Sequence, residues 1–107
     1  MIVKMIAATM MGAWLVISTA AAADEIVITQ KGKVFSEKKV TLQVGDTISF
    51  VNDDESTHNV YSRSKGHKFD IGAQRPGTAI SHQFNQAGKV KVRCAIHPRM
   101  KVTVIVE

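Results

Sequence analysis

The sequence feature with the clearest chemical meaning is the spacing Cys94-x-x-His97-x-x-Met100. It offers a thiolate, an imidazole and a thioether, which are soft ligands of the kind that copper prefers. Zinc is usually held by cysteine, histidine and carboxylates, so the methionine favours copper over zinc. With one more histidine, this set would supply two histidines and one cysteine in a trigonal plane, with a weak axial methionine. The spacing therefore predicts a copper site built on a loop that joins two strands.

Three other histidines, His58, His67 and His82, are candidates for the missing ligand. His67 lies in a loop rich in lysine and glycine, where we expect water to surround it. His82 alternates with Ile80 and Phe84, which predicts a place at the edge of the core. His58 opens a predicted strand, so its position near the end of a sheet would be fixed. His58 is the best placed of the three on these grounds.

Cys94 has other interpretations when composition alone is considered. The chain contains a single cysteine, so it cannot form an internal disulfide bond. Three roles for Cys94 stay open on this evidence: a buried inert thiol, a disulfide between two chains and a metal ligand. Thiol or hydrolytic catalysis would need a base, an orienting group and an oxyanion site. The sequence carries no conventional motif for an oxyanion site, which argues against an enzyme.

The N-terminal segment has the composition of a secretory signal peptide. Lys4 precedes an uncharged, mostly apolar run over 5–23, which ends in an Ala-x-Ala pattern at Ala23. We expect cleavage there, which divides the chain into a signal peptide over 1–23 and an exported, periplasmic domain over 24–107. A retained membrane anchor is the alternative, since a run of this length can just span a bilayer. The expected mature chain keeps one cysteine, one methionine and four histidines, with 13 Lys and Arg against 9 Asp and Glu.

Hydrophobic alternation beyond residue 23 indicates short strands. Val90, Val92 and Cys94 share one parity, which predicts that the thiol points into the core. No segment has the period or the caps of an amphipathic helix. The connection over 63–77 is rich in glycine and charge and is expected to be irregular. The sequence therefore predicts one all-β domain, a small sandwich of about seven strands, at 26–29, 40–44, 47–51, 58–62, 78–84, 89–94 and 101–106.

Two segments give this domain a resemblance to a known family. The segment 44–52, followed by His58-Asn59-Val60, resembles the first-histidine region of plastocyanin-like cupredoxins. The segment 84–100 resembles their second ligand region, and its short loop with proline after the histidine is most similar to that of amicyanins. The resemblance implies a Greek-key β-sandwich of the cupredoxin type with one type 1 (blue) copper ion. Carried over by position, Asn59 would brace the cysteine loop through hydrogen bonds, and the ligands would be His58, Cys94, His97 and Met100.

The resemblance also implies a function. A cupredoxin would carry single electrons between redox partner proteins by cycling between Cu(II) and Cu(I), and it would not be an enzyme. The alternative is a copper-handling protein, a periplasmic carrier or buffer that uses the same ligands. Runs of exposed methionine or histidine would favour copper handling, whereas the predicted mature chain has one methionine and no histidine cluster. The sequence therefore favours electron transfer.

The loop around His97 is the expected docking surface. On this loop, His97 would expose its outer ring edge as the point where electrons leave. Ala95, Ile96 and Pro98 would form a small apolar patch around it. A partner protein is therefore expected to meet the copper site at this loop.

Charge predicts the kind of partner. Lys and Arg are scattered along the sequence rather than gathered in a run, and export argues against nucleic acid. We expect Lys65, Lys68, Arg75 and Arg99 to attract an acidic redox partner, because charge complementarity raises encounter rates. No membrane contact is expected once the signal peptide is removed, and a small carrier is expected to be a monomer.

Overall fold

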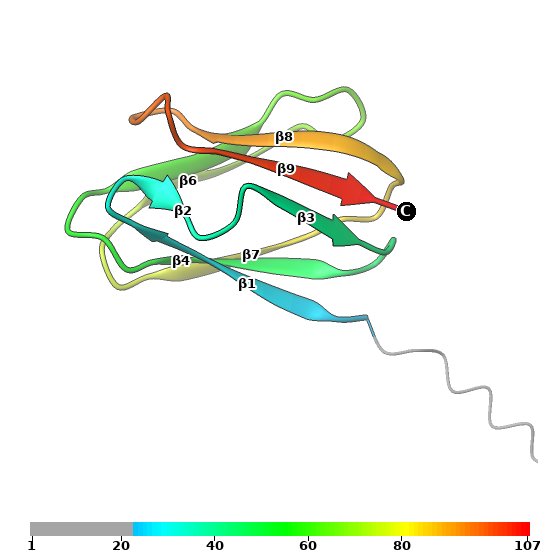
Figure 1. The fold of residues 1–107 in the computed structure, drawn as a ribbon, viewed down its shortest axis with the longest axis horizontal. Coiled ribbons are helices and arrows are strands. Elements are labelled where there is room, and N and C mark those ends of the chain that lie inside the picture. The colour runs from blue at the N-terminus through cyan, green and yellow to red at the C-terminus, as the bar shows by residue number, and fades with distance from the viewer. Residues whose placement is uncertain (1–22) are drawn as a thin grey trace, which may run out of the picture.

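The computed structural model describes residues 23–107, which form nine strands (Figure 1). The predicted signal peptide lies outside the described residues except for Ala23. Within the described part, no helix has the length and apolar character that crossing a membrane requires. The strands are β1 (Glu25–Lys31), β2 (Val34–Phe35), β3 (Lys39–Leu42), β4 (Thr47–Asn52), β5 (His58–Ser62), β6 (Phe69–Gln74), β7 (Ala79–Gln83), β8 (Gly88–Cys94) and β9 (Lys101–Val106).

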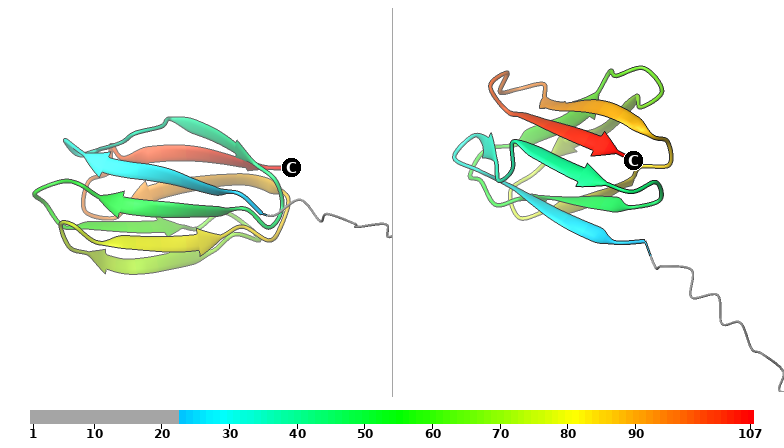
Figure 2. Two further views of the ribbon diagram at one scale, coloured as in Figure 1. Left: turned by 90° about the horizontal axis from the view of Figure 1, so that it is seen from below. Right: turned by 45° about the vertical axis from the view of Figure 1, so that its right-hand side comes forward.

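The strands form two sheets that pack face to face as a sandwich (Figures 1 and 2). One sheet has the strand order β2-β1-β4-β7, and the other has the order β3-β9-β8-β5-β6. Most neighbours are antiparallel, but β1 pairs with β4, and β3 with β9, in parallel. The antiparallel pairing of β5 with β8 brings the start of β5 to the end of β8. The predicted all-β sandwich is confirmed, with nine strands in place of about seven.

Alternation of residue type explains which side chains fill the space between the sheets. In β8, Val90, Val92 and Cys94 are buried, whereas the residues between them are exposed. The last strand, β9, buries every second residue in the same way. Each fully buried aliphatic side chain contributes roughly 1.5–3 kcal/mol to stability. The predicted inward direction of Cys94 is confirmed, since the residue is 2% exposed.

The connection predicted over 63–77 is partly wrong, because it contains the six residues of β6. Gly72 lies inside this strand with a φ of 75°, a conformation that residues with a side chain rarely adopt. The register between β5 and β6 also shifts between Asn59 and Tyr61. A bulge of this kind breaks the period of two. An interpretation based on alternation therefore misses the strand.

Two smaller differences concern the first half of the chain. The strand β2 is two residues long, which is too short for a periodic pattern, and it was not expected. The strand predicted over 40–44 ends at Leu42, two residues early. Val44, expected inside that strand, is consequently 50% exposed.

Buried glutamines connect the two sheets. Gln30 of β1 donates through Nε2 to Oε1 of Gln74 on β6 at 2.8 Å. Gln74 in turn donates through its own Nε2 to the backbone oxygens of Phe50 and Thr78, at 2.6 and 2.8 Å. Both glutamines are fully buried, so these bonds replace the water that the amides lose on folding.

Asn52, at the end of β4, extends these contacts into the loop that leads to β5. Its Nδ2 donates to the backbone oxygens of Gln74 at 2.8 Å and Ser56 at 2.9 Å. Its Oδ1 accepts from the backbone N–H of Asp54 at 2.9 Å. The loop before His58 is therefore held from inside the sandwich by a side chain that is itself fully buried.

We expect His82 to make stability depend on pH. Its ring stacks on Phe69 with centroids 3.9 Å apart, and burial, followed by the nearby charge of His67, lowers the pKa of His82. The unfolded chain then binds this proton more readily than the folded chain, so the free energy of unfolding should fall as pH drops below about 6.5. His82→Phe should keep the stacking and flatten that slope. Urea unfolding of both copper-free proteins between pH 7.5 and 5 measures the difference, and equal slopes would contradict the expectation.

Candidate metal centre

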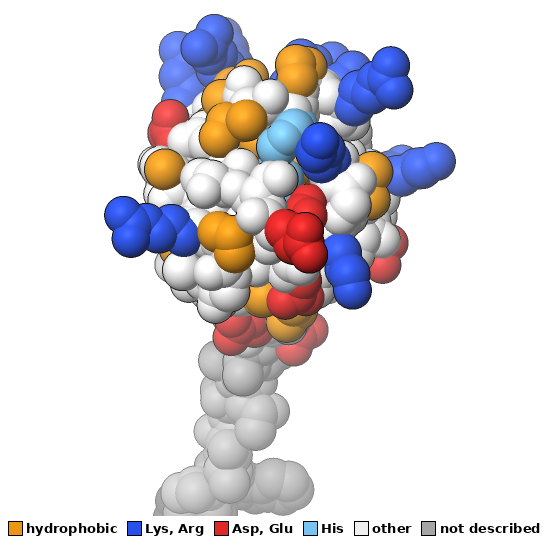
Figure 3. All heavy atoms as spheres, turned by 90° about the vertical axis from the view of Figure 1, so that its left-hand side faces the viewer, with side chains coloured by type: hydrophobic (Ala, Val, Ile, Leu, Met, Phe, Trp, Pro, Cys, Tyr) orange, Lys and Arg blue, Asp and Glu red, His pale blue; other side chains and the backbone are white. Residues whose placement is uncertain are grey.

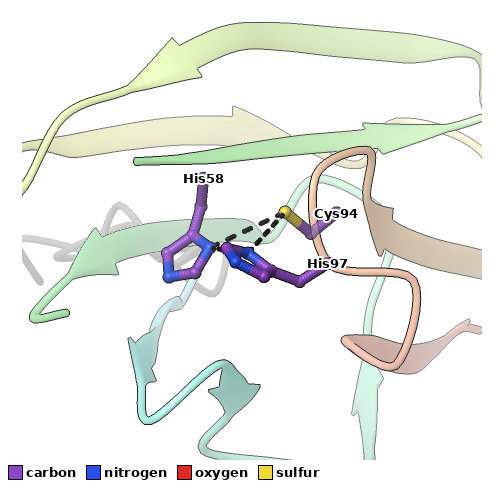
Figure 4. Close-up of side chains that lie close together, drawn as sticks. All are labelled: His58, Cys94 and His97. Carbon is purple, nitrogen blue, oxygen red and sulfur yellow. Dashed lines mark hydrogen bonds between the residues drawn. The ribbon is translucent and has the colours of Figure 1, made fainter. Parts of the chain in front are cut away.

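Three side chains from different elements converge at one end of the sandwich (Figure 4). His58 is the first residue of β5, Cys94 is the last residue of β8, and His97 lies in the loop between β8 and β9. The Nδ1 atoms of the two histidines are 3.0 Å apart. The Sγ atom of Cys94 lies 3.7 Å from Nδ1 of His58 and 3.9 Å from Nδ1 of His97. The three donor atoms thus form a compact triangle.

This triangle suits one copper ion. Three ligands bonded at about 2.0–2.3 Å in a trigonal plane are separated from each other by roughly 3.5 Å or slightly more. The three observed separations bracket that value. One thiolate and two imidazoles are also the in-plane donors of blue-copper sites. The residues present therefore fit copper both in chemistry and in spacing.

Burial differs among the three donors. His58 is fully buried and Cys94 is 2% exposed, whereas His97 is only partly buried. The site therefore has a closed side, formed by the core, and one ring that reaches the surface. His97 is thus the donor through which the site reaches the protein surface.

Asp54 holds the far side of the His58 ring. Nε2 of His58 lies 3.0 Å from Oδ2 of Asp54. The same oxygen accepts from the backbone N–H of Lys33 at 2.8 Å. These two hydrogen bonds lower the pKa of Asp54 to about 2, and the one from Lys33 has the larger effect. The carboxylate is therefore ionised. It assigns the His58 proton to Nε2 and leaves a lone pair on Nδ1, the atom that lies beside His97 and Cys94.

Backbone hydrogen bonds fix the loop that carries the other two donors. The N–H of Ala95 donates to the oxygen of Asn59 at 3.0 Å, and the N–H of Met100 donates to the oxygen of His97 at 3.0 Å. The N–H of Asn59 donates to Sγ of Cys94 at 3.4 Å. Asn59 therefore braces the cysteine loop, as expected, but through its backbone.

The side chain of Asn59 has a different partner. Its Nδ2 donates to Oδ1 of Asp70, on the neighbouring strand β6, at 2.9 Å. That carboxylate oxygen also accepts from the backbone N–H of Gly72 at 2.8 Å. The amide thus ties β5 to β6 beside the bulge.

Met100 lies at the end of the same loop. It is fully buried in the hydrophobic core, and its backbone oxygen accepts from the N–H of Cys94 at 3.3 Å. Its role as the axial ligand stays a prediction. The histidines that sequence reasoning set aside, His67 and His82, do not belong to the cluster of donors and instead line one hollow elsewhere, together with Phe84.

Two neighbours of the site were not expected. Asp54 was seen only as part of an acidic turn, although its offset of four residues from His58 was a usable signal. The second unexpected neighbour is the turn between β1 and β2. No local sequence pattern places Lys33 and Val34 beside His97. Together with Ile96, Pro98 and Arg99, they line a hollow of about 440 Å³.

The surface around this hollow is partly apolar. Val34 is 56% exposed and Ile96 is 51% exposed. Figure 3 looks at this end of the sandwich, where a histidine lies among hydrophobic side chains, with acidic and basic side chains close by. Of the four cations expected to attract a partner, Arg99 lines the hollow, whereas Lys68 lines a different one beside Tyr61.

Comparisons with known proteins point in one direction. The family model described as copper binding proteins of the plastocyanin/azurin family matches residues 22–107. The methylamine utilization protein MauL of Methylorubrum extorquens is 36% identical over 83 residues, which are 77% of this chain and 73% of that protein. MauL of Methylophilus methylotrophus is 31% identical over 67 residues, 60% of this chain and 38% of that protein.

Solved structures give the same picture. An amicyanin variant in its reduced Cu(I) form at pH 4 superposes with a TM-score of 0.72 and 26% identity, covering 78% of this chain and 82% of amicyanin. A purple cupredoxin from Nitrosopumilus maritimus superposes with a TM-score of 0.68 and 26% identity, covering 77% of this chain and 99% of that protein.

Proposed function

Because the chain belongs to the plastocyanin/azurin family of copper-binding proteins, it is a cupredoxin and an electron-transfer copper protein, and we propose that it carries single electrons by Cu(II)/Cu(I) cycling. It is not an enzyme, and its partners are redox proteins. The observation that carries the proposal is the triangle of His58, Cys94 and His97 donor atoms, all within 4.8 Å of one another. Copper held there supplies a one-electron couple that the side chains themselves lack.

The proposed ligands are His58, Cys94, His97 and Met100, which together would hold one copper ion. The burial of His58, Cys94 and Met100 would keep water from the ion. The hydrogen bonds of the loop and of Asp54 would hold the donors in one arrangement for both oxidation states. Little reorganisation would then accompany each transfer.

We expect Asp54→Asn to weaken copper binding. The variant keeps the size of the side chain but removes the charge that orients His58 and raises its basicity. Loss of such a carboxylate typically lowers metal affinity about 10–100-fold. Competition titration with a chelator measures the change for Cu(II). Asp53→Asn is the matched control, because Asp53 neighbours Asp54 in the same loop and is exposed; an equal loss in both variants would contradict the role of Asp54.

We expect Ile96→Lys to slow electron exchange and leave the copper site intact. The apolar hollow beside His97 would be the contact surface, and a new charge there would disfavour docking. Electron self-exchange, measured by NMR line broadening in mixtures of oxidised and reduced protein, should fall about tenfold, equivalent to about 1.4 kcal/mol. Val44→Lys is the control, since Val44 is equally exposed and lies outside the hollow. An unchanged rate of electron self-exchange in Ile96→Lys would show that this hollow is not the contact surface.

The proposal includes export to the periplasm, with residues 24–107 as the mature, monomeric domain. The uncharged run that ends at Ala23 supports it. Expression of the full chain in a bacterium, followed by mass spectrometry of the periplasmic protein, tests the cleavage point. A chain that kept residues 1–23 in the membrane fraction would be an anchored protein instead.

Titration of the purified chain with Cu(II) tests the function. One equivalent should produce an intense blue thiolate-to-copper band, and stopped-flow reduction and reoxidation should both be fast and reversible. A colourless complex would contradict the type 1 site. A blue protein that exchanged electrons slowly but gave up its copper readily to an apo-acceptor would instead be a copper-handling protein.

A further inference from the structure

The outer face of the five-stranded sheet gathers cations that are spread along the sequence. In β8, the residues that alternate with the buried ones are exposed, and three of them are basic. The neighbouring strand β9 and the edge strand β3 each begin with an exposed lysine. We call this set the basic sheet face; it consists of Lys39, Lys89, Lys91, Arg93 and Lys101.

The strand register brings these charges together. Arg93 lies directly opposite Lys101 on β9 and opposite Tyr61 on β5. Lys91 and Lys39 both pair with Thr103. Like charges opposite each other destabilise a sheet, so this arrangement works against the fold. Basic residues that are scattered along the sequence thus lie together on the folded surface.

Carboxylates do not neutralise this face. Among residues 23–107, the only ion pair involving a carboxylate joins His58 and Asp54. Asp70 is exposed on the same sheet, but it lies on the edge strand β6 and accepts hydrogen bonds from Asn59 and Gly72. The basic sheet face thus keeps its charge in a protein whose acidic loop, 53–55, lies at the end of the sandwich beside the metal centre.

A hollow at one side of the face offers a place for an anionic group. It has a volume of about 340 Å³ and is lined by Tyr61, Arg63, Ser64, Lys91 and Arg93. The guanidinium of Arg63 lies over the Tyr61 ring, 5.5 Å from its centroid, which holds this cation in place. Three cations and two hydroxyl groups around one hollow suit a carboxylate side chain.

We propose that the basic sheet face is a docking surface for an acidic protein partner, with a carboxylate of that partner in the hollow. The inference rests on the proposed electron-transfer function, because Arg93 directly precedes Cys94 and a partner seated here lies within one residue of the proposed ligand. The acidic loop at the end of the sandwich would repel the same partner, so the two charged regions together set its orientation. This surface is separate from the apolar hollow at His97.

The test uses a decaglutamate peptide as the probe. NMR shift mapping on the 15N-labelled full-length mature protein, both copper-free and Cu(I)-loaded, should place the largest shifts on β8, β9 and the hollow. The double variant Lys91→Glu/Arg93→Glu should bind at least about tenfold more weakly. Lys31→Glu/Lys38→Glu changes the net charge equally at exposed residues outside the basic sheet face and should change binding less than about twofold.

Several outcomes would overturn the inference. Equal losses in both double variants would show a response to net charge alone. Shifts spread over the whole surface would show that there is no defined site. Binding to phosphatidylglycerol vesicles or to a DNA duplex, without binding to the peptide, would assign the face to a different partner. The peptide is also tested on copper-free protein, so the docking result does not depend on copper binding. A missing blue band would contradict the proposed function without deciding whether the peptide binds to this face.

Discussion

Cys94→Ser is expected to abolish the blue absorption of the copper-loaded protein completely. The band arises from charge transfer between thiolate sulfur and Cu(II), and Cys94 is the single cysteine of the chain. Serine is nearly isosteric, and Cys94 contributes its side chain to a packed core at 2% exposure, so the fold should survive with a modest loss of stability. Cu(II) titration followed by visible and circular dichroism spectroscopy measures colour and fold together.

Met100→Leu is the companion to that variant. Leucine fills a similar volume in the core, where Met100 is fully buried. Because the thiolate is retained, the blue band should persist, while loss of a weak axial thioether should change its shape and shift the reduction potential. A blue band that persisted in Cys94→Ser would show that the Cys94 thiolate is not a copper ligand. A spectrum and potential unchanged in Met100→Leu would remove Met100 from the proposed ligands.

Gln74→Leu is expected to lower the free energy of unfolding by about 3 kcal/mol or more. The substitution removes three hydrogen bonds, namely the two that Gln74 donates to the backbone oxygens of Phe50 and Thr78 and the one that it accepts from the amide of Gln30. A buried group that loses its partner costs about 1–3 kcal/mol. Gln30 Oε1 already has no protein partner, so Gln30 would lose the single side-chain contact that holds its amide.

Urea unfolding of the copper-free proteins measures this effect. Gln83→Leu is the matched control, because the exposed Gln83 also donates through Nε2 to a backbone oxygen, that of Gly45 at 3.0 Å. The control should change stability by less than about 0.5 kcal/mol. A loss of similar size in both variants would show that burial of the glutamine network does not matter. A copper affinity reduced along with stability in Gln74→Leu would show that the network also positions the loop before His58.

Local sequence patterns predicted the features of this molecule that depend on residues close together in the sequence. The two-residue period of β8 oriented Cys94, and the short spacing from Cys94 to His97 matched a turn that the structure closes with backbone hydrogen bonds. His58 was selected because it opens a strand, and the pairing of β5 with β8 places it beside Cys94. The donor residues thus follow from local patterns, whereas their meeting in one triangle depends on the pairing of β5 with β8.

Features that depend on partners distant in sequence were missed. The strand β6 needs the bulge at Gly72, which hides its alternation. The contact between Lys33 and Asp54 joins two loops that are 21 residues apart. The basic sheet face appears only when β8 and β9 are placed in register. Such features arise from contacts between strands and loops that are distant in sequence, and the hydrophobic periodicity of a single segment does not predict these contacts.

The place of β9 in the second sheet has a consequence for the order of assembly. This strand lies between β3 and β8, and among residues 23–107 it is the only strand with which β3 pairs. A chain that ends before Lys101 therefore leaves β3 without a neighbour and exposes one side of the strand that carries Cys94. Synthesis must therefore pass β9 before the donor atoms can be held together, so a nascent chain that still lacks this strand has no finished site with which to capture the metal.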